Sequence, residues 1–180
     1  MPLRPARCYT PLKGPAYTRR EYIGSGLHPK VVKFRMGNPH GEFDVELKLI
    51  AKEAGHVRHN ALEAARLMAS KFLATHLPEQ SYYLIIHPYP HHILRENKMM
   101  AFAGADRLQD GMRLAFGDPV GLAARVYPGT VVMTVRAKRE RAELAKQALK
   151  RAASKLPVPC KIAVKSLTRP ETVDVSGGSS

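Results

Sequence analysis

The sequence predicts an α+β domain in which two helices pack on a mixed sheet. Two observations indicate this class. Several short stretches alternate apolar and polar residues, as half-buried strands do, and two longer stretches repeat apolar residues at helical spacing. The chain has 180 residues, 44% of them hydrophobic, which suffices for one ordinary core. We therefore expect a single domain over residues 1–170 and a flexible tail over residues 171–180, which ends in "SGGSS".

Residues 1–30 are predicted to form an extended arm. Four prolines and Gly14 are mixed with Arg and Lys within the first 15 residues. Such a composition buries little apolar surface and disfavours helix. The arm is therefore expected to gain order from a polyanionic partner, because phosphate contacts offset the cost of ordering it.

Two strands are predicted next, "KVVKFRM" over residues 30–36 and "FDVELKLIAKE" over residues 43–53, with the turn "GNPHG" between them. In the first, Val32, Phe34 and Met36 share one face. In the second, the apolar residues at alternate positions define a core-facing side: Phe43, Val45, Leu47 and Leu49.

The segment "ALEAARLMASKFLATHL" is predicted to be a helix. Asn60, followed three residues later by Glu63, resembles a capping pair that begins a helix, and Pro78 ends it. The apolar residues at helical spacing give the face toward the core: Leu62, Ala65, Ala69, Phe72 and Leu73.

Four further stretches read as strands before the second helix: "YYLIIHP" (82–88), "HHILRENKMMAF" (91–102), "PVGLAARV" (119–126) and "TVVMTVRA" (130–137). A turn at "YPG" is predicted to join the third of these strands to the fourth. In residues 91–102, the side chains at odd-numbered positions from Ile93 to Met99 are expected to lie on one face of the strand. Those at even-numbered positions from Leu94 to Met100 are expected to lie on the other face.

A second helix is predicted over residues 139–154, with a last strand, "CKIAVKSL", over residues 160–167. Four residues are expected to face the core: Leu144, Ala148, Leu149 and Ala152. Three are expected to face outward: Lys146, Lys150 and Arg151. Because a strand flanks each end, this basic helix is interpreted as a crossover helix whose apolar face is used by the core, and not as a membrane-surface helix.

The charge of +14 is unevenly distributed along the chain. Residues 1–35 hold eight basic residues against one acidic residue, residues 36–135 hold ten of each, and residues 136–169 hold eleven basic against two acidic. A balanced middle with two basic ends indicates a folded core that presents a phosphate-binding surface. No apolar run approaches the ~20 residues of a membrane-spanning helix, so nucleic acid is the favoured partner and no membrane partner is expected.

Candidate sites for metal or catalysis are weak. His87, His91 and His92 cluster in "HPYPHH", but adjacent residues of a strand point to opposite faces, so surface or base-stacking roles are favoured and no metal is predicted. Asp106 and Asp110 could pair for acid–base chemistry, yet arginines compete for them and no nucleophile motif accompanies them. We predict no catalytic residue and no cofactor.

Cys8 and Cys160 form no metal-binding pattern and suggest no disulfide framework, which fits a reducing compartment. The stretch "AGADRLQDGMRLAFG", residues 103–117, is too long for a hairpin turn. Its two inner glycines free the backbone, and Arg107 and Arg113 can donate two hydrogen bonds each to phosphate, so we expect a projecting loop.

Six motifs together resemble the large-subunit ribosomal protein family L16p/L10e: "RPARCY" (4–9), "ALEAAR" (61–66), "NKM" (97–99), "AGADRLQDGMR" (103–113), "AFG" (115–117) and "ARV" (124–126). The resemblance extends from Arg4 to about Leu167, and the chain is similar to archaeal members because it lacks a long C-terminal extension. It departs from the family pattern at Asp118, where Lys is expected, and at Leu122, where Thr is usual. The charge reversal at Asp118 puts a phosphate contact at that position in doubt.

The resemblance implies a fold of the α/β-hammerhead type and a structural, non-enzymatic role in the cytoplasmic ribosome. The implied partners are large-subunit rRNA, A-site and P-site tRNA and neighbouring large-subunit proteins, with support for tRNA positioning, translation and late subunit maturation. The candidate rRNA-binding residues are Arg4, Arg7, Lys13, Arg19, Arg20, Lys30, Lys33, Arg35, Arg95, Asn97, Lys98, Arg136, Lys138 and Arg139.

The resemblance also directs the loop toward the peptidyl transferase region and the P-site tRNA end. The candidate residues of this tRNA-centre loop are Gly104, Ala105, Asp106, Arg107, Leu108, Gln109, Asp110, Gly111, Met112 and Arg113. The alternative function is a free regulatory protein that binds RNA or DNA with the same basic ends.

Overall fold

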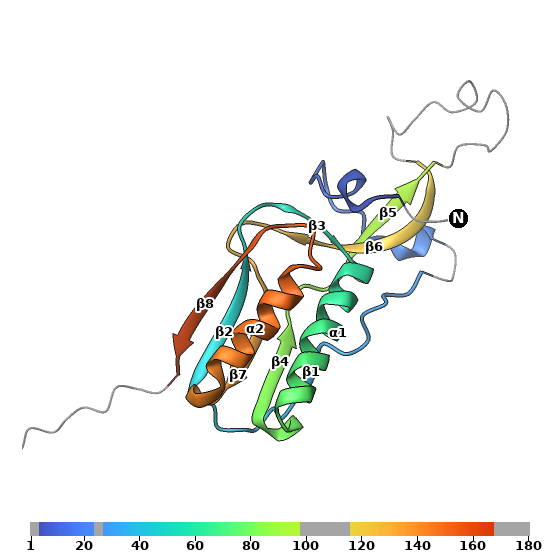
Figure 1. Cartoon of the computed structure of the whole chain (residues 1–180). Coiled ribbons are helices and arrows are strands. Elements are labelled where there is room, and N and C mark those ends of the chain that lie inside the picture. The colour runs from blue at the N-terminus through green and yellow to red at the C-terminus, as the bar shows by residue number, and fades with distance from the viewer. Residues whose placement is uncertain (1–3, 24–26, 98–115, 168–180) are drawn as a thin grey trace, which may run out of the picture.

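The computed structural model describes residues 4–23, 27–97 and 116–167, and within them two α-helices and two sheets are formed (Figure 1). The five-stranded sheet has the order β1-β4-β7-β2-β8, and the three-stranded sheet has the order β3-β6-β5. The strands are β1 (Arg35–Gly37), β2 (Val45–Ala51), β3 (Gly55–Arg58), β4 (Tyr82–Ile86), β5 (His92–Glu96), β6 (Asp118–Val126), β7 (Val131–Ala137) and β8 (Cys160–Ser166). The helices are α1 (His59–His76) and α2 (Ala142–Ala153).

The predicted α+β class with two helices packed on a sheet is confirmed. The strands form two sheets instead of one mixed sheet, and every pairing among the described strands is antiparallel. β7 and β8 both lie antiparallel to β2, one on each side of it, so they run parallel to each other. A connection between parallel strands has to cross over the sheet, and α2 makes that crossover as predicted.

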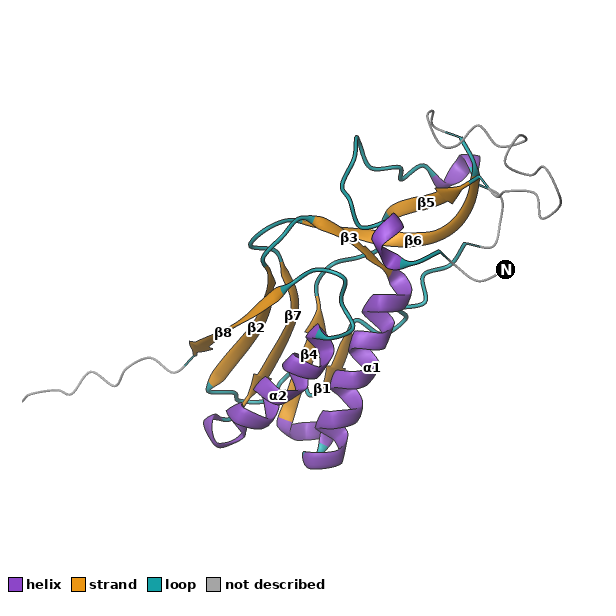
Figure 2. Ribbon diagram, turned by 45° about the horizontal axis from the view of Figure 1, so that its top comes forward, coloured by secondary structure: helices purple, strands orange, loops and turns teal. Residues whose placement is uncertain are grey.

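Both helices cover the same face of the five-stranded sheet, and the opposite face is open (Figures 1 and 2). Alternating residues of β2, β7 and β4 meet the helices in aligned rows, of which Leu47, Val135 and Leu84 form one. All three side chains are fully buried, and burying each contributes roughly 1.5–3 kcal/mol. The five predicted core residues of α1 are all buried. In α2, Ala145 is buried where the sequence favoured Leu144, which is only partly buried.

The three-stranded sheet lies beyond one end of the five-stranded sheet, next to the start of α1 (Figure 2). β6 and β7 are consecutive in sequence and joined by the predicted turn, where Gly129 has a φ of +89°. They nevertheless belong to different sheets. The turn therefore carries the chain from one sheet to the other.

Two strand predictions need correction. The strand expected over residues 30–36 is limited to β1, Arg35–Gly37, and Val32 is 82% exposed while Val31 is buried. β1 meets β4 closely: a Cβ on Gly37, whose φ is +88°, would lie 2.1 Å from the carbonyl oxygen of Tyr82.

β3 was not predicted, because four residues that include a glycine and run directly into a helix carry no alternation or turn signal.

The predicted start of α1 is wrong by two residues, and the capping pair is not formed. The helix begins at His59 directly after the extended Arg58, and no side chain caps it. Asn60 lies inside the first turn, and Glu63 instead accepts a hydrogen bond from Arg66 at 2.8 Å. Because β3 runs straight into α1, the position of the helix start is decided by the pairing of β3 with β6.

Within the strand predicted over residues 91–102, the structure describes His92–Glu96 as β5, and both faces of this strand are covered at its start. His92, Ile93 and Leu94 are all buried, although they are consecutive. The N-terminal arm explains this, because it lies against β5, where the Ile93 N–H donates to the Tyr17 carbonyl oxygen at 2.9 Å. The arm thus covers an edge strand that would otherwise be exposed.

Candidate nucleic-acid interface

The N-terminal arm is bound to the three-stranded sheet from Arg4 to Tyr17. It contains two 3-10 turns, Ala6–Cys8 and Arg20–Tyr22, and no other helix or strand among its described residues. The Thr10 carbonyl oxygen accepts the His56 N–H at 2.8 Å, and the Gly14 carbonyl oxygen accepts from the Arg125 guanidinium at 3.0 Å. These contacts hold the backbone, so the basic side chains of the arm are left toward solvent.

Near its beginning the arm is held by Glu96 at the end of β5. The Tyr9 hydroxyl donates to Glu96 Oε2 at 3.0 Å, and Arg4 Nε lies 2.7 Å from Glu96 Oε1. Burial, together with the hydrogen bond to this carboxylate, raises the pKa of Tyr9 to about 12. The Arg58 guanidinium lies over the Tyr9 ring and donates to the Arg4 carbonyl oxygen at 2.9 Å. Arg4, predicted to bind rRNA, therefore already has a protein partner.

Two buried histidines join the middle of the arm to the sheet. The rings of His56 and His92 stack at 4.4 Å with 12° between their planes. His56 Nδ1 lies 3.1 Å from the carbonyl oxygens of Tyr9 and Pro11, so it donates to them. His92 Nδ1 accepts the Tyr17 N–H at 3.0 Å, so it carries no proton.

The surface role expected for His92 is wrong, because this residue is only 6% exposed. His91 is exposed, and His87 Nε2 lies 2.7 Å from Thr134 Oγ1 at the edge of the open sheet face. Within the described ranges, no three His, Cys, Asp or Glu side chains come together as a metal site would require.

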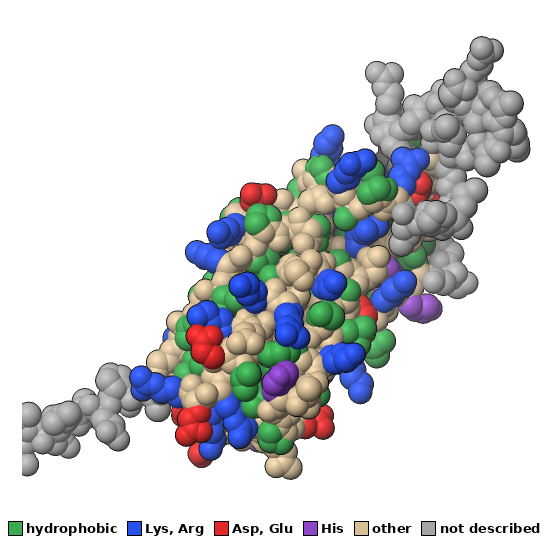
Figure 3. All heavy atoms as spheres, viewed as in Figure 1, with side chains coloured by type: hydrophobic (Ala, Val, Ile, Leu, Met, Phe, Trp, Pro, Cys, Tyr) green, Lys and Arg blue, Asp and Glu red, His purple; other side chains and the backbone are tan. Residues whose placement is uncertain are grey.

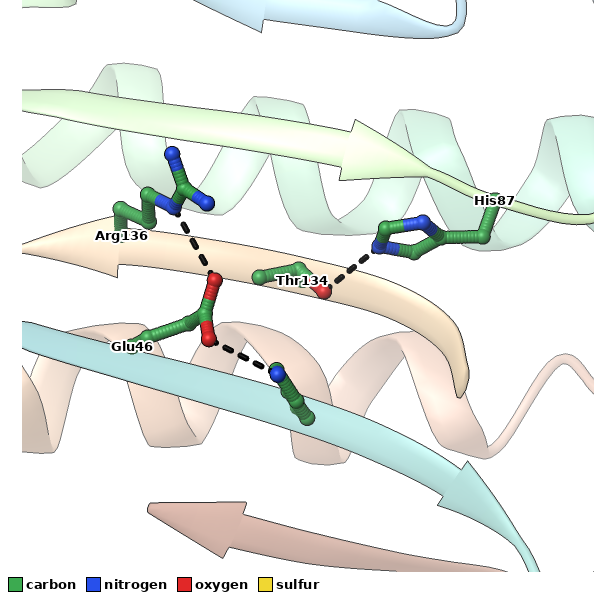
Figure 4. Close-up of polar contacts among 5 residues, drawn as sticks. Glu46, His87, Thr134 and Arg136 are labelled. Atoms are coloured by element: carbon green, nitrogen blue, oxygen red, sulfur yellow. Dashed lines mark hydrogen bonds and ion pairs between the residues drawn. The ribbon is translucent and has the colours of Figure 1, made fainter. Parts of the chain in front are cut away.

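The open face of the five-stranded sheet carries an ordered set of charges (Figure 4). Glu46 is only 6% exposed and forms two ion pairs. Its Oε1 lies 3.0 Å from Arg136 Nε, and its Oε2 lies 2.9 Å from Lys48 Nζ. Burial opposes ionisation of Glu46, but the hydrogen bonds from Lys48 and Arg136 outweigh it, so the pKa of Glu46 is lowered. The glutamate fixes the two cations in place on the sheet surface.

Three more cations share this face. The strand register places Lys165 opposite Glu46, Lys161 opposite Ile50 and Arg35 opposite Ile85. All three are exposed. We define the basic sheet face as Arg35, Lys48, Arg136, Lys161 and Lys165, with Glu46 at its centre. The sequence prediction included Arg35 and Arg136 but missed the three lysines, although their alternation in "ELKLIAK" and "CKIAVKS" is the signal that could have found them.

The helical face is basic as well. Lys and Arg side chains are spread along this face in Figure 3, whereas most Asp and Glu side chains seen in that view lie toward its lower end. The outward positions predicted for α2, Lys146, Lys150 and Arg151, are all exposed. The Arg151 guanidinium lies 4.2 Å above the Phe72 ring, so its stem covers apolar surface while its charge remains on the surface.

The remaining candidate residues fall into two groups. The exposed ones lie on the arm, just after it and just before α2. On the arm they are Arg7, Lys13, Arg19, Arg20 and Lys30, after the arm comes Lys33, and before α2 come Lys138 and Arg139. The partly buried ones lie at the end of β5, where Arg95 stacks on Tyr17 at 4.1 Å and Asn97 follows the strand. Lys98 and the tRNA-centre loop, residues 104–113, lie outside the described residues.

Asp118 is the first residue of β6, exposed and opposite Glu96 in the strand register. The Lys expected at this position would lie near a carboxylate that already holds Arg4. Apart from this position, the geometry assembles exposed cations on the arm and on both faces of the larger sheet. Such a distribution favours contact with a polyanion from several directions.

Among the helices of the described ranges, none is both long enough and apolar enough to cross a membrane.

The family model described as ribosomal protein L16p/L10e matches residues 12–163. A protein of Staphylothermus marinus called large ribosomal subunit protein uL16 is 65% identical over 167 residues, which cover 93% of this chain and 96% of that protein.

Proteins of the same name in two other organisms are similar over comparable lengths. The one in Sulfolobus acidocaldarius is 59% identical, with 94% of this chain and 97% of that protein covered. The one in Hyperthermus butylicus is 57% identical, with 91% of this chain and 94% of that protein covered. The family match over residues 12–163 includes both helices and residues of every strand of the two sheets.

Proposed function

Because this chain belongs to the ribosomal protein L16p/L10e family and is thereby a structural constituent of the large ribosomal subunit, we propose that it binds large-subunit rRNA beside the cleft for A-site and P-site tRNA. Its partners in the ribosome are rRNA and neighbouring ribosomal proteins. In this proposal, it supports tRNA positioning and late subunit maturation by binding, without turnover of a substrate.

The observation that supports this proposal best is the placement of positive charge. Exposed arginines and lysines lie on the arm, on the basic sheet face and on the outer side of α2. A protein that binds one stretch of nucleic acid needs a single basic face, whereas one embedded in folded rRNA meets phosphates from several directions. The wide distribution therefore favours the ribosomal role over a free RNA- or DNA-binding regulator.

The proposed domain plan assigns residues 1–30 to an rRNA-binding arm and residues 103–117 to a loop that projects toward the tRNA-binding centre. The described part of the arm fits this plan, because its backbone is held by the sheet while Arg7, Lys13 and Arg19 remain exposed. In the loop, Arg107 and Arg113 are proposed to contact phosphates, and Asp106 and Asp110 to weaken the hold on a tRNA that has to leave in every cycle.

Two measurements test the proposal. In cell extract, the protein should sediment with large ribosomal subunits, and a substantial pool in the light fractions would favour the regulator. In a strain carrying Arg107→Ala and Arg113→Ala together, we expect a folded protein with fewer polysomes or delayed large-subunit maturation. Normal polysome profiles in that strain would remove the proposed role of the loop while leaving the role of the arm in place.

A further inference from the structure

A pocket of about 520 Å³ lies between the arm, β5 and the beginning of β6. Its volume lies within the range of roughly 300–1,000 Å³ that is usual for sites of small organic ligands. The pocket is lined by residues 16–19, 22 and 23 of the arm, by Ile93 and Arg95 of β5 and by residues 116, 117 and 119 at the beginning of β6. The lining residues used here are Tyr17, Arg19, Tyr22, Ile93, Arg95 and Phe116.

The walls of this pocket are held in place by the protein itself. Tyr17 is fixed at both backbone groups, because its N–H donates to His92 and its carbonyl oxygen accepts from Ile93. Arg95 spans the pocket: its guanidinium lies 4.1 Å over the Tyr17 ring, and Nη1 donates to the Phe116 carbonyl oxygen at 3.2 Å. Ile93, which is 2% exposed, gives a rigid apolar floor.

The rims of the pocket present aromatic rings to solvent. Tyr22 is 78% exposed and Phe116 is 43% exposed. Of the five large aromatic side chains that are exposed within the described ranges, three line this pocket, including Tyr17. Aromatic side chains dominate the energetics of interfaces, so their concentration at one concave site indicates a ligand with a flat apolar surface.

The charge of the pocket restricts the ligand further. Arg19 and Arg95 both line it, and none of its lining residues is acidic. Guanidinium groups hold phosphate through paired hydrogen bonds and also stack on flat rings. A ligand with one flat heteroaromatic part and one phosphate satisfies both features, and this is the chemistry of a nucleotide.

We propose that this pocket receives one unstacked nucleotide of a single-stranded RNA segment, with its base against Tyr22 and Phe116 and its phosphate at Arg19. This inference rests on the proposed function, because that function supplies the RNA. Sequence-specific recognition of RNA uses unpaired bases that stack on aromatic side chains, whereas a paired base is inaccessible to such a pocket. The basic surfaces then bind phosphates without regard to base, and the pocket selects an unpaired position.

The test uses the full chain and a pentaribonucleotide that carries the fluorescent base 2-aminopurine at its centre. Stacking of one base contributes roughly 1–3 kcal/mol, which corresponds to a change in affinity of about 5-fold to 150-fold. We therefore expect Tyr22→Leu or Phe116→Leu to weaken binding by at least about fivefold. The quenching of 2-aminopurine by the wild-type protein should also be lost. Tyr127→Leu is the matched control, because Tyr127 is 52% exposed and lies outside the pocket.

Further arms of the experiment separate the possible ligands. With a central abasic site, the wild type and Tyr22→Leu should bind equally, because no base is left to stack. If adenosine monophosphate binds as tightly as the pentanucleotide, the ligand is a free nucleotide and the assignment to RNA is overturned. Unchanged affinity and quenching in both pocket variants, with circular dichroism showing that they are folded, would overturn the pocket itself.

Binding to a fully paired RNA duplex distinguishes this failure from failure of the proposed function. Tyr22→Leu should leave duplex affinity unchanged, since that affinity comes from phosphate contacts on the basic surfaces. If the duplex binds with a steep salt dependence but the pocket variants behave as wild type, only the pocket proposal is lost. If neither RNA binds, both proposals are lost.

Discussion

His92 is the residue whose environment differs most from the sequence-based expectation. Burial, together with the neighbouring His56, Arg125 and Arg95, lowers its pKa to about 4 from an ordinary value of 6.5. Its neutral Nδ1 accepts the Tyr17 N–H, which closes the arm onto the sheet. A proton on Nδ1 would abolish this hydrogen bond and place a positive charge among three basic groups. The attachment of the arm is thus linked to the neutral state of one imidazole.

The free energy of unfolding should therefore fall with acidification. Between pH 6.5 and about 4 the unfolded chain binds a proton at His92 that the folded chain does not, so stability is full above pH 6.5 and is lost toward pH 4. The loss amounts to at most about 3 kcal/mol, since one unit of pKa corresponds to about 1.4 kcal/mol. Denaturant unfolding at pH 7.5 and 4.5 measures it.

His92→Gln should reduce this pH dependence, because glutamine does not titrate. Part of the dependence should remain, because burial also lowers the pKa of His56, His59 and His87. The matched control is His91→Gln, since His91 is the adjacent residue and is exposed. If His92→Gln and the wild type lose the same free energy between the two pH values, the linkage assigned to His92 is wrong.

At the scale of elements, the arm and the three-stranded sheet depend on each other. The arm contributes Tyr9, Thr10 and Tyr17, and the sheet contributes His56, His92 and Glu96. Glu96 is the only carboxylate among these six residues. It accepts the hydrogen bond of the Tyr9 hydroxyl and forms an ion pair with Arg4. Glu96 at the end of β5, together with Arg58, therefore holds the beginning of the arm.

Replacing Glu96 by Ala should release the beginning of the arm while the five-stranded sheet remains folded. A hydrogen bond to a charged group contributes roughly 1.5–3 kcal/mol, and the 47% exposure of the Arg4 side chain reduces its share, so we expect about 1–2 kcal/mol of local stability to be lost. Trypsin should then cleave after Arg7 several times faster, as followed by mass spectrometry, whereas Pro5 blocks cleavage after Arg4. Glu42→Ala, at an exposed glutamate in the turn before β2, is the control. Equal cleavage rates in the two variants would contradict the role of Glu96.

At the scale of the whole molecule, cations surround a neutral core. The basic sheet face lies on one side of the five-stranded sheet, α2 lies on the other, and the arm lies beyond its end on the smaller sheet (Figures 1 and 4). Within the basic sheet face, Glu46 neutralises part of the charge of Lys48 and Arg136, while Lys161 and Lys165 have no ion pair among the described residues. β8 is therefore the strand expected to contribute most to phosphate binding on this face.

Lys161→Ala combined with Lys165→Ala should weaken binding to rRNA fragments without preference for sequence. Each phosphate contact adds about 0.7–0.9 to the slope of log affinity against log salt concentration, so the slope should fall by up to about 1.4–1.8. The control is Lys161→Arg with Lys165→Arg, which keeps both charges and should keep the slope. Salt titration of the three proteins measures the slopes, and a double alanine variant with the wild-type slope would remove β8 from the interface.

The sequence by itself determined the features that depend on order along the chain. The charge segregation, the buried face of α1, the outward cations of α2 and the alternation of β2 all follow from local composition and periodicity, so they were predicted correctly. The motif set also indicated the family that the comparisons confirm.

Only the tertiary structure decided the features that depend on which strands pair. The assignment of β6 and β7 to different sheets and the start of α1 depend on strand pairing, which no local pattern encodes. Alternation marks Lys48, Lys161 and Lys165 as residues of a polar face, but only the pairing of β2 with β8 brings the three lysines together. The burial of His92 and the pocket beside Tyr17 depend on the path of the arm across β5. A proline-rich arm looks extended in sequence, but its hydrogen-bonding partners come from residues about 75 positions away, and only folding brings them together.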